Sequence, residues 1–370
     1  MKYKTQILLL LSVITFIISP SLSYGQGKSN PLRLGIVGLS HGHLGEVVSR
    51  IDRGDFIIVG VAEKNTDLWS INKKLKEKVS IERFYTDLEK MLKESQPEAV
   101  IVYTSIYDHL AVVEACAPKG IHVMVEKPLA VSLEHAHKMN DLVKENPIHL
   151  LTNYETTWYP SNHTVYDFIH AENKIGNIVR MNIYAGHEGP IEIGCGPEFT
   201  EWLTNPKLNG GGAVIDFGCY GANLSTWLMG GERPQSVYAK LKTLKPSVYP
   251  AVDDEATIIL EYPKVTTLVM GSWNWPMSRK DMHIYGTKGY VYQDDNISLR
   301  IGDNSSQSAV ESEPLDAPYN DAFLYLKSVV RGDIAVNSND LSSLDNNLVV
   351  MEILDAAIRS SNENRPIDLK

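Results

Sequence analysis

Residues 35 to 45 read Gly35-Ile36-Val37-Gly38-Leu39-Ser40-His41-Gly42-His43-Leu44-Gly45. An apolar run over residues 32–37 leads into this glycine-rich segment, and a helical pattern over residues 44–51 follows it. A short buried strand, a tight glycine turn and a helix form the first unit of a parallel α/β sheet. The segment therefore predicts an α/β fold with a ligand-binding turn near its start.

The same alternation continues outward along the first half of the chain. Further short apolar runs, typical of buried strands, cover residues 56–62, 100–103, 122–125 and 149–151. Helical patterns cover residues 110–118 and 133–144, with a charged helical stretch before residue 100. Strands alternating with helices indicate parallel βαβ units, so we expect a doubly wound Rossmann domain over residues 31–152.

The pattern changes in the second half. Longer alternating stretches cover residues 178–184, 236–241, 256–260, 266–273 and 282–285, which is typical of antiparallel strands with one face covered. Helices are predicted over residues 212–229, 322–330 and 344–360. We expect a C-terminal α+β domain over residues 153–370, built on a mostly antiparallel open sheet.

The chain begins with the three parts of a secretory signal peptide, predicted over residues 1–25. Lys2 and Lys4 precede an apolar run over residues 7–18, and Pro20 and small residues up to Gly25 follow it. The run is shorter than the roughly 20 residues of a membrane-spanning helix, so a permanent anchor is the weaker alternative. We expect an exported protein, periplasmic or secreted, that has no membrane attachment once the signal is removed.

Composition narrows the class of ligand. The chain has 370 residues, 22% of them charged and 43% hydrophobic, which excludes disorder and a coiled coil. Its 45 acidic residues against 35 basic ones argue against binding to nucleic acid. The three scattered cysteines fit neither a disulfide framework nor a CxxC zinc site. A small polar ligand fits best, and we expect no metal.

The glycine turn can hold a dinucleotide. Gly38 is the first glycine of the fingerprint G-x-G-x-x-G, with Ser40 and His43 at the second and third places. The turn and helix N-terminus would bind a pyrophosphate through backbone N–H groups. Glu63 ends the second strand, where an acid meets a ribose 2′-hydroxyl, whereas Lys64 could reach a 2′-phosphate. The expected cofactor-binding residues here are Gly38, Ser40, His41, Gly42, His43, Glu63 and Lys64. NAD and NADP both stay open, as does a turn without a ligand.

A second segment, Glu126-Lys127-Pro128, ends the fourth apolar run. Ligands of parallel sheets bind at the carboxyl ends of the strands, so Lys127 should face the reacting end of a bound cofactor. An ammonium there would polarise a carbonyl or lower the pKa of a neighbouring hydroxyl. The alternative is a buried structural ion pair.

A third segment carries Asp216, Tyr220 and Asn223 at positions i, i+4 and i+7, on one face of the predicted helix. Gly218 and Gly221 each cost roughly 1 kcal/mol inside a helix, and close approach to a flat ring would explain them. A solvated polar stripe is the alternative.

Together these segments resemble the Gfo/Idh/MocA family of sugar oxidoreductases. The most specific matches are Val125-Glu126-Lys127-Pro128-Leu129 and Gly-Gly-Gly-x3-Asp-x-Gly-x-Tyr over residues 210–220, with Tyr285-Gly286-Thr287-Lys288-Gly289 in support. The resemblance implies a Rossmann domain that binds NAD or NADP and hydride transfer at a sugar or polyol carbon. It also implies a homo-oligomer formed through the C-terminal sheet.

The departures from the family pattern are informative. Many members carry histidine where this chain has Tyr220 and aspartate where it has Asn223, and the difference is similar to the branch of glucose-fructose oxidoreductase and certain aldose dehydrogenases. In that branch tyrosine takes the proton. His109 matches a family histidine, and the resemblance places Glu126, Thr104 and His109 near the cofactor.

The resulting hypothesis places a sugar hydroxyl between Lys127 and Tyr220. A hydride leaves the carbon while Tyr220 accepts the proton, Lys127 lowers the pKa of the phenol, and Asp216 orients the lysine. Aromatic and polar side chains suited to a sugar are Tyr154, Trp158, His187, Asn223 and Trp273.

Three functions stay open at this point. Free dinucleotide is scarce outside the cytoplasm, so an exported oxidoreductase would keep its cofactor tightly bound and recycle it. A glycosidase that oxidises its sugar transiently would use the same parts. A non-catalytic sugar-binding protein is disfavoured because Lys127, Asp216 and Tyr220 are all present.

Overall fold

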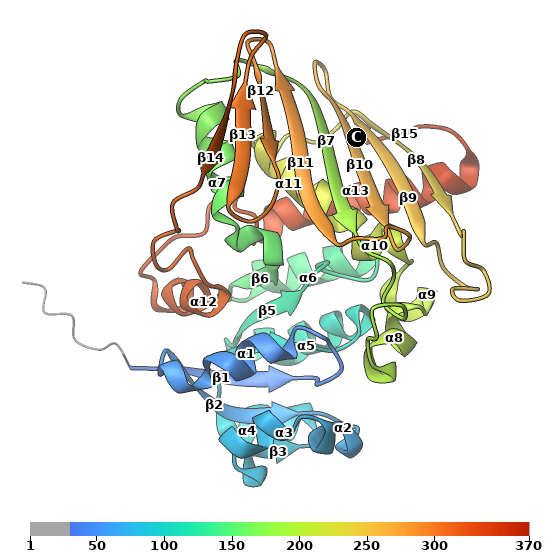
Figure 1. Ribbon diagram of the computed structural model, residues 1–370. Helices are drawn as coiled ribbons and strands as arrows, with labels where there is room; N and C mark the ends of the chain where they lie inside the picture. The colour runs from blue at the N-terminus through green and yellow to red at the C-terminus, as the bar shows by residue number, and fades with distance from the viewer. Residues whose placement is uncertain (1–29, 370) are drawn as a thin grey trace, which may run out of the picture. The chain divides into compact units, whose positions relative to one another are not determined.

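A parallel sheet and a mostly antiparallel sheet, each with packed helices, make up the described part of the chain, residues 30–369 of a computed structural model (Figure 1). The predicted signal peptide lies outside the described residues. The chain from Pro31 onward forms one compact unit that contains both sheets.

The first sheet has six parallel strands in the order β3-β2-β1-β4-β5-β6. The strands are β1 (Leu32–Val37), β2 (Phe56–Ala62), β3 (Phe84–Tyr85), β4 (Ala99–Val102), β5 (His122–Glu126) and β6 (Leu150–Asn153). The strand order reverses between β1 and β4, which is the point where doubly wound sheets bind ligands. The predicted Rossmann architecture is confirmed.

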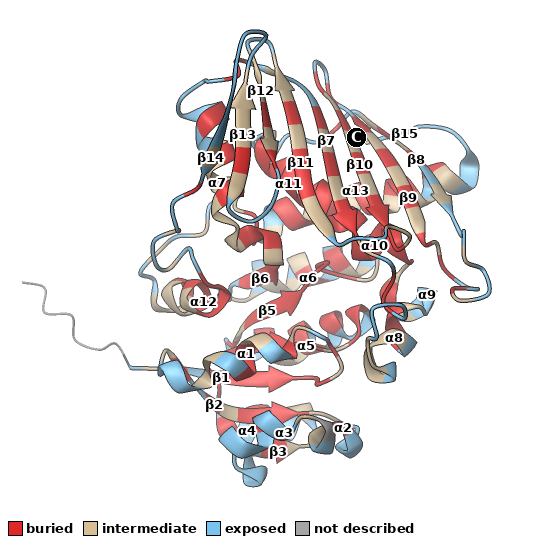
Figure 2. Cartoon of the chain, in the orientation of Figure 1, coloured by how far each residue is buried: buried red, intermediate tan, exposed pale blue. Residues whose placement is uncertain are grey.

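Helices cover both faces of this sheet. They are α1 (Leu44–Arg50), α2 (Thr66–Ile71), α3 (Lys73–Lys78), α4 (Leu88–Ser95), α5 (His109–Cys116) and α6 (Leu133–Glu145). Because both faces are covered, the central strands are continuous apolar runs, and β1 and β5 are almost entirely coloured as buried in Figure 2. The sequence analysis missed β3, which has only two residues.

The second sheet has nine strands in the order β14-β13-β12-β11-β7-β10-β9-β8-β15. They are β7 (Ile178–Gly186), β8 (Ser236–Lys242), β9 (Glu255–Glu261), β10 (Thr266–Ser272), β11 (Arg279–Gly286), β12 (Tyr290–Gln293), β13 (Ser298–Gly302), β14 (Gln307–Glu311) and β15 (Ile367–Asp368). Within this sheet, β7 and β10 are the only parallel neighbours among the described strands, so the predicted mostly antiparallel sheet is confirmed.

Four helices of the second half pack against this sheet: α7 (Pro160–His170), α10 (Ala213–Asp216), α11 (Gly218–Leu228) and α13 (Leu344–Glu363) (Figure 1). Helix α12 (Ala322–Arg331) packs instead against the parallel sheet, where Phe323 meets Phe56. Helices α8 (Pro197–Leu203) and α9 (Pro206–Asn209) lie beside turns of the parallel sheet, and Trp202 of α8 contacts His41. Across residues 30–369 no helix combines the length and the apolarity needed to span a membrane.

The predicted single helix over residues 212–229 is wrong, because it is interrupted by a turn at Phe217 and forms α10 and α11. The expected role of the glycines also changes. A Cβ atom at Gly221 would lie 2.2 Å from Val269 Cγ1, and one at Gly218 would lie 3.2 Å from Ile258 Cδ1. These glycines let α11 pack closely against β9 and β10 rather than against a flat ligand.

Candidate active site

A cavity of about 350 Å³ opens at the carboxyl ends of β1, β2 and β4. This is a volume typical of small-ligand pockets, at the point where the strand order reverses. The predicted cofactor-binding residues that line it are Gly38, Ser40, Glu63, Lys64 and Thr104.

The backbone around Gly38 forms a cradle that only glycine permits. Gly38 has a φ of +83°, and a Cβ atom there would lie 2.5 Å from Thr104 Cγ2 and 2.7 Å from the Thr104 nitrogen. Its N–H donates to the carbonyl of Ala62, 2.8 Å away. The turn therefore brings bare backbone to the edge of the cavity, as a pyrophosphate requires.

Glu63 closes the other side of this turn. One carboxylate oxygen accepts from the N–H of Leu39 at 2.9 Å, and the other accepts from the N–H of Asn65 at 2.8 Å. The carboxylate keeps lone pairs for a ribose hydroxyl, and Lys64 lies beside it on the cavity wall. These residues fit the adenosine and pyrophosphate half of a dinucleotide.

A second cavity, of about 300 Å³, lies against the antiparallel sheet. Its lining includes Glu155, Tyr159, His187, Phe217, Arg279 and Lys280. Lys280 forms an ion pair with Glu155, and Arg279 pairs with Asp281 at 2.6 Å. Two aromatic faces among paired charges and hydrogen-bonding groups suit a polyhydroxylated ring.

The two sheets together bring Lys127 and Asp216 into contact. Lys127 Nζ lies 2.5 Å from Asp216 Oδ1 and 3.0 Å from the Asp216 carbonyl oxygen, and both side chains are buried. Burial works against the charge on Asp216, but Lys127 and a hydrogen bond from Trp273 outweigh it and lower the pKa to about 2. Burial likewise opposes the charge on Lys127, yet Asp216 raises its pKa. The pair is ionised.

Tyr220 lies beside this pair. Lys127 Nζ lies 5.0 Å from the centroid of its ring, and so does Lys280 Nζ from the second cavity. Burial raises the pKa of the Tyr220 phenol well above its ordinary value, and Glu155 adds to the effect. The expectation that Lys127 lowers this pKa is therefore wrong, because the ammonium faces the ring and is paired with Asp216.

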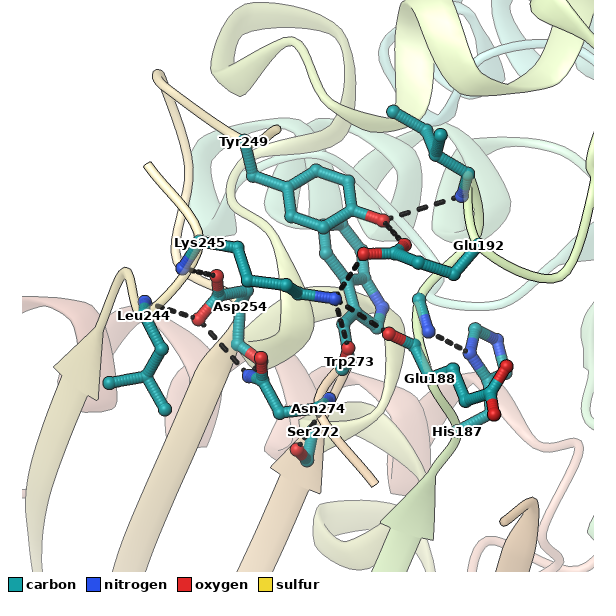
Figure 3. Close-up of polar contacts among 12 residues, drawn as sticks. His187, Glu188, Glu192, Leu244, Lys245, Tyr249, Asp254, Ser272, Trp273 and Asn274 are labelled. Carbon is teal, nitrogen blue, oxygen red and sulfur yellow. Dashed lines mark hydrogen bonds and ion pairs between the residues drawn. The ribbon is translucent and has the colours of Figure 1, made fainter. Parts of the chain in front are cut away.

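Figure 3 shows the loop after β7, which carries His187 into the second cavity. His187 Nδ1 accepts from the N–H of Gly189 at 2.9 Å, so the neutral ring keeps a proton on Nε2. Burial lowers the pKa of His187. The neutral ring can therefore donate a hydrogen bond to a ligand.

Lys245 and Tyr249 fix the shape of this loop (Figure 3). Lys245 Nζ donates to the carbonyls of Glu188 and Trp273, each at 2.7 Å, and pairs with Glu192, to which the Tyr249 hydroxyl also donates. Trp273 in turn donates from Nε1 to Asp216 Oδ2 at 2.9 Å. The sequence analysis missed Lys245, Tyr249 and Glu192, because no motif joins residues from two loops so far apart in the chain.

Four predicted substrate residues do not line the second cavity. Tyr154, Asn223 and Trp273 are completely buried, and Asn223 Nδ2 donates to the Leu341 carbonyl at 2.9 Å. Trp158 donates from Nε1 to Asn153 Oδ1 at 3.0 Å. The structure does not bring these four side chains to the second cavity, and their roles toward a sugar stay predictions. Asp216 and Tyr220 lie in two successive helices but both contact Lys127, whereas Asn223 bonds to the Leu341 carbonyl.

The remaining predicted cofactor residues lie outside the lining of the first cavity. His109 is completely buried, and its Nδ1 donates to the Leu129 carbonyl at 3.1 Å, which ties the start of α5 to the loop after β5. Glu126 is also completely buried, with Oε2 2.9 Å from His43 Nδ1. His41 packs its ring against Trp202 of α8. Gly42 likewise does not line the cavity, so for this group cofactor contact stays a prediction.

Comparison with known proteins agrees with this geometry. Residues 32–154 match the model of an oxidoreductase family with an NAD-binding Rossmann fold, and residues 168–292 match the GFO/IDH/MocA C-terminal domain. The chain is 23% identical over 301 residues to D-xylose 1-dehydrogenase [NADP(+)] of Haloarcula marismortui, covering 78% of this chain and 80% of the relative. It is 24% identical over 265 residues to trans-1,2-dihydrobenzene-1,2-diol dehydrogenase of Homo sapiens, covering 70% and 73%.

Solved structures share the fold. An aldose-aldose oxidoreductase from Caulobacter crescentus, complexed with glycerol, has a TM-score of 0.78 and 20% identity, covering 92% of this chain and 100% of that one. An inositol dehydrogenase homolog from Azotobacter vinelandii, complexed with NAD+, has a TM-score of 0.79 and 18% identity, covering 92% and 98%. The fold, the dinucleotide-type cavity and the two family matches lead to one conclusion: the chain belongs to the GFO/IDH/MocA oxidoreductase family and is an NAD(P)-dependent oxidoreductase.

Proposed function

We propose that the protein transfers a hydride to or from a carbinol carbon of a sugar held in the second cavity, with the reacting oxygen beside Lys127 and Tyr220. The observation that carries the proposal is the buried Lys127–Asp216 pair, which lies against Tyr220 and belongs to neither cavity lining. Lys280 contacts both Tyr220 and the second cavity, which relates the sugar site to the phenol. The named relatives that act on xylose and on a dihydrodiol support the substrate class.

When bound, NAD or NADP supplies hydride acceptance and donation. The chain's own contribution begins with binding. The Gly38 turn offers backbone N–H groups, Glu63 accepts from ribose hydroxyls, and Lys64 is placed for a 2′-phosphate.

Lys127 stabilises negative charge on the sugar oxygen. A fixed ammonium in a buried site acts through a low effective dielectric constant and needs no reorganisation when charge develops. Asp216 keeps that ammonium in place through its carboxylate and its carbonyl. Trp273 and the Lys245 loop hold Asp216 from the other side.

Tyr220 handles the proton. Burial keeps the phenol protonated, and an alkoxide is a far stronger base than a phenolate, so the phenol is acid enough to protonate the oxygen when a carbonyl is reduced. In the direction of oxidation the same oxygen receives the carbinol proton as a phenolate, so the phenol must first release its own proton to solvent. His187 donates from Nε2 to orient the sugar.

The test is a substrate screen on the purified full chain. Aldoses and polyols are incubated with NAD or NADP, and absorbance in the nicotinamide band is followed; aryl glycosides are assayed in parallel without added cofactor. Cofactor reduction by free sugars supports the proposal. Aryl glycoside cleavage alone would replace it by a glycosidase, and sugar binding with neither reaction would replace it by a sugar-binding protein.

We further propose that the protein is exported and keeps its cofactor tightly bound. Support comes from the apolar run over residues 7–18 with its basic start and small-residue end. Mass spectrometry of the native protein tests export, and an intact Met1 would contradict it. Nicotinamide absorbance in the protein as purified tests retention of the cofactor.

We also propose that the C-terminal sheet forms a homo-oligomer contact. A row of half-buried rings, Tyr184, His283, Tyr292, Tyr285 and Tyr290, runs across neighbouring strands, with centroids of adjacent rings 4.3 to 5.8 Å apart. Partly exposed aromatic clusters of this kind are typical of interfaces. Light scattering on Y292K should show a smaller assembly than the wild type, and an unchanged mass would contradict the proposal.

A further inference from the structure

We propose that His41, His43 and Glu126 form a binding site for a divalent metal of the Zn²⁺ type. One potential ligand atom from each residue lies within 4.8 Å of those of the other two, and no other group of three such residues meets this criterion within residues 30–369. The site lies at the carboxyl edge of the parallel sheet, between the first-strand turn and the end of β5. It goes beyond the proposed function and does not depend on it.

The carboxylate is already fixed in orientation. Glu126 is completely buried; its Oε2 accepts from His43 Nδ1 at 2.9 Å, and its Oε1 accepts from Asn153 Nδ2 at 2.9 Å. Asn153 is held in turn by the indole N–H of Trp158 at 3.0 Å. Chains of this kind hold the ligands of metal sites, and a metal ion would replace the proton that His43 and Glu126 share.

The two histidines converge on the carboxylate from one short turn. His41 and His43 are separated only by Gly42, and their ring centroids lie 4.7 Å apart at an angle of 64°. His41 Nδ1 accepts from the N–H of His43 at 3.1 Å, so this nitrogen carries the lone pair that a metal needs, and ligation would exchange this contact for a metal bond. The rings of Phe199 and Trp202 pack against His41 and limit its motion.

The donor set selects the kind of metal. Two imidazoles and one carboxylate suit Zn²⁺, Co²⁺, Ni²⁺ or Fe²⁺, whereas Mg²⁺ and Ca²⁺ prefer oxygen ligands throughout. Zn²⁺ needs nitrogen and oxygen ligands at about 2.0 to 2.2 Å, a contraction of the cluster that small side-chain rotations can supply. Three protein ligands leave a fourth position open, and His43 is the partly exposed member, with 28% of its side chain accessible.

This assignment also explains a departure in the sequence. His43 stands where the dinucleotide fingerprint has its third glycine, and Glu126 directly precedes Lys127. Neither His43 nor Glu126 lines the first cavity, so cofactor binding does not account for their hydrogen bond.

The experiment uses the full chain stripped of metal with a chelator. Zn²⁺ binding is measured by calorimetry, and Co²⁺ binding by its ligand-field absorption, without cofactor or sugar. The wild type should bind one equivalent. N153A, which loosens Glu126, should bind about 10-fold to 100-fold more weakly. H43A and E126Q, which remove ligands, should bind more weakly still, with circular dichroism confirming that each variant is folded.

The matched control is H149A. It removes one ring of the stacked pair His122 and His149, whose centroids lie 5.2 Å apart far from the turn in sequence. H149A should bind as the wild type does. Binding that survives in folded H43A and E126Q, binding that is lost in H149A, or a wild type that takes up no metal would each overturn the proposal.

Discussion

The two halves of the active site are built in different ways. The first cavity is formed by turns that follow neighbouring strands of one sheet, with bare backbone at Gly38 and carboxylate hydrogen bonds at Glu63. The Lys127–Asp216–Tyr220 centre joins a residue that follows β5 to residues of α10 and α11, and it buries opposite charges. Local chain geometry thus shapes the cofactor half, whereas long-range packing creates the chemical half. The predictions below test this division.

The largest effect is expected for K127M. Loss of the ammonium removes the charge that stabilises the sugar oxygen, so turnover should fall at least about 1000-fold. Because Lys127 does not line the first cavity, dinucleotide affinity should be unchanged. Steady-state rates and a fluorescence titration measure the two quantities.

K127M also leaves Asp216 buried without its cation, which costs roughly 3–5 kcal/mol of stability. The double variant K127M/D216N removes both charges and should recover folding without recovering turnover. The control is K119M, which alters a lysine on the surface, and it should behave as the wild type. Near-normal turnover in K127M would contradict the proposal that Lys127 belongs to the half of the site that carries the chemistry.

His109, which ties the start of α5 to the loop after β5, should make stability depend on pH. Burial lowers its pKa to about 4, below the value of about 6.5 in an unfolded chain. The folded state therefore binds fewer protons, so the free energy of unfolding should fall by up to about 3 kcal/mol as pH drops from about 6.5 to about 4.

Urea unfolding of wild type and H109Q at several pH values in that window isolates this contribution. The difference in unfolding free energy between the two proteins should change with pH, shifting in favour of H109Q as the solution becomes more acidic. A constant difference would mean that His109 does not titrate in this way.

The cofactor half alone should respond to G38A. A methyl group there meets Thr104, and the positive φ is strained for alanine, at a cost of about 1–3 kcal/mol. Both the melting temperature and dinucleotide affinity should fall. G42A is the matched control, since a Cβ atom at Gly42 has no neighbour within 4 Å. Equal losses of melting temperature and of dinucleotide affinity in G38A and G42A would contradict the proposed role of the Gly38 turn.

The smallest effects should separate NAD from NADP. E63Q weakens acceptance from the ribose hydroxyls and should reduce NAD affinity about tenfold, with little change for NADP. K64M should weaken the binding of NADP and leave the binding of NAD unchanged, because only NADP has a 2′-phosphate that can pair with the Lys64 ammonium. Titration of both variants with both dinucleotides decides the preference. If K64M weakened the binding of NAD and NADP equally, the assigned role of Lys64 would be excluded.

Much of the fold could be predicted because neighbouring residues encode it. The bounds of β1 and β2 match the predicted runs, since both strands are buried on both faces and end at turns. The strands β12, β13 and β14 were missed, because they are short and their residues are largely partly exposed or exposed. The interruption of the helix at Phe217 was also missed, because it depends on how α10 and α11 pack against the second sheet.

For the site too, the sequence predicted residues at strand ends better than residues chosen by type. Gly38, Glu63 and Lys64 were identified as neighbours of predicted strand ends, and the structure places them on one cavity. Tyr154, Asn223 and Trp273 were assigned to the sugar by residue type, and the structure buries them. Residue type shows what a side chain could bind, but its surroundings decide which partners it has in the folded chain.

The amino-acid order by itself determined the strand-turn-helix units, the need for glycine at residue 38 and the supply of charged groups at strand ends, because backbone conformation depends on adjacent residues. Tertiary structure alone decided that Lys127 meets Asp216, that the Tyr220 phenol holds its proton and that His41 and His43 converge on Glu126. Ionisation and coordination depend on desolvation and on partners within a few ångströms, and segments far apart in the chain set both.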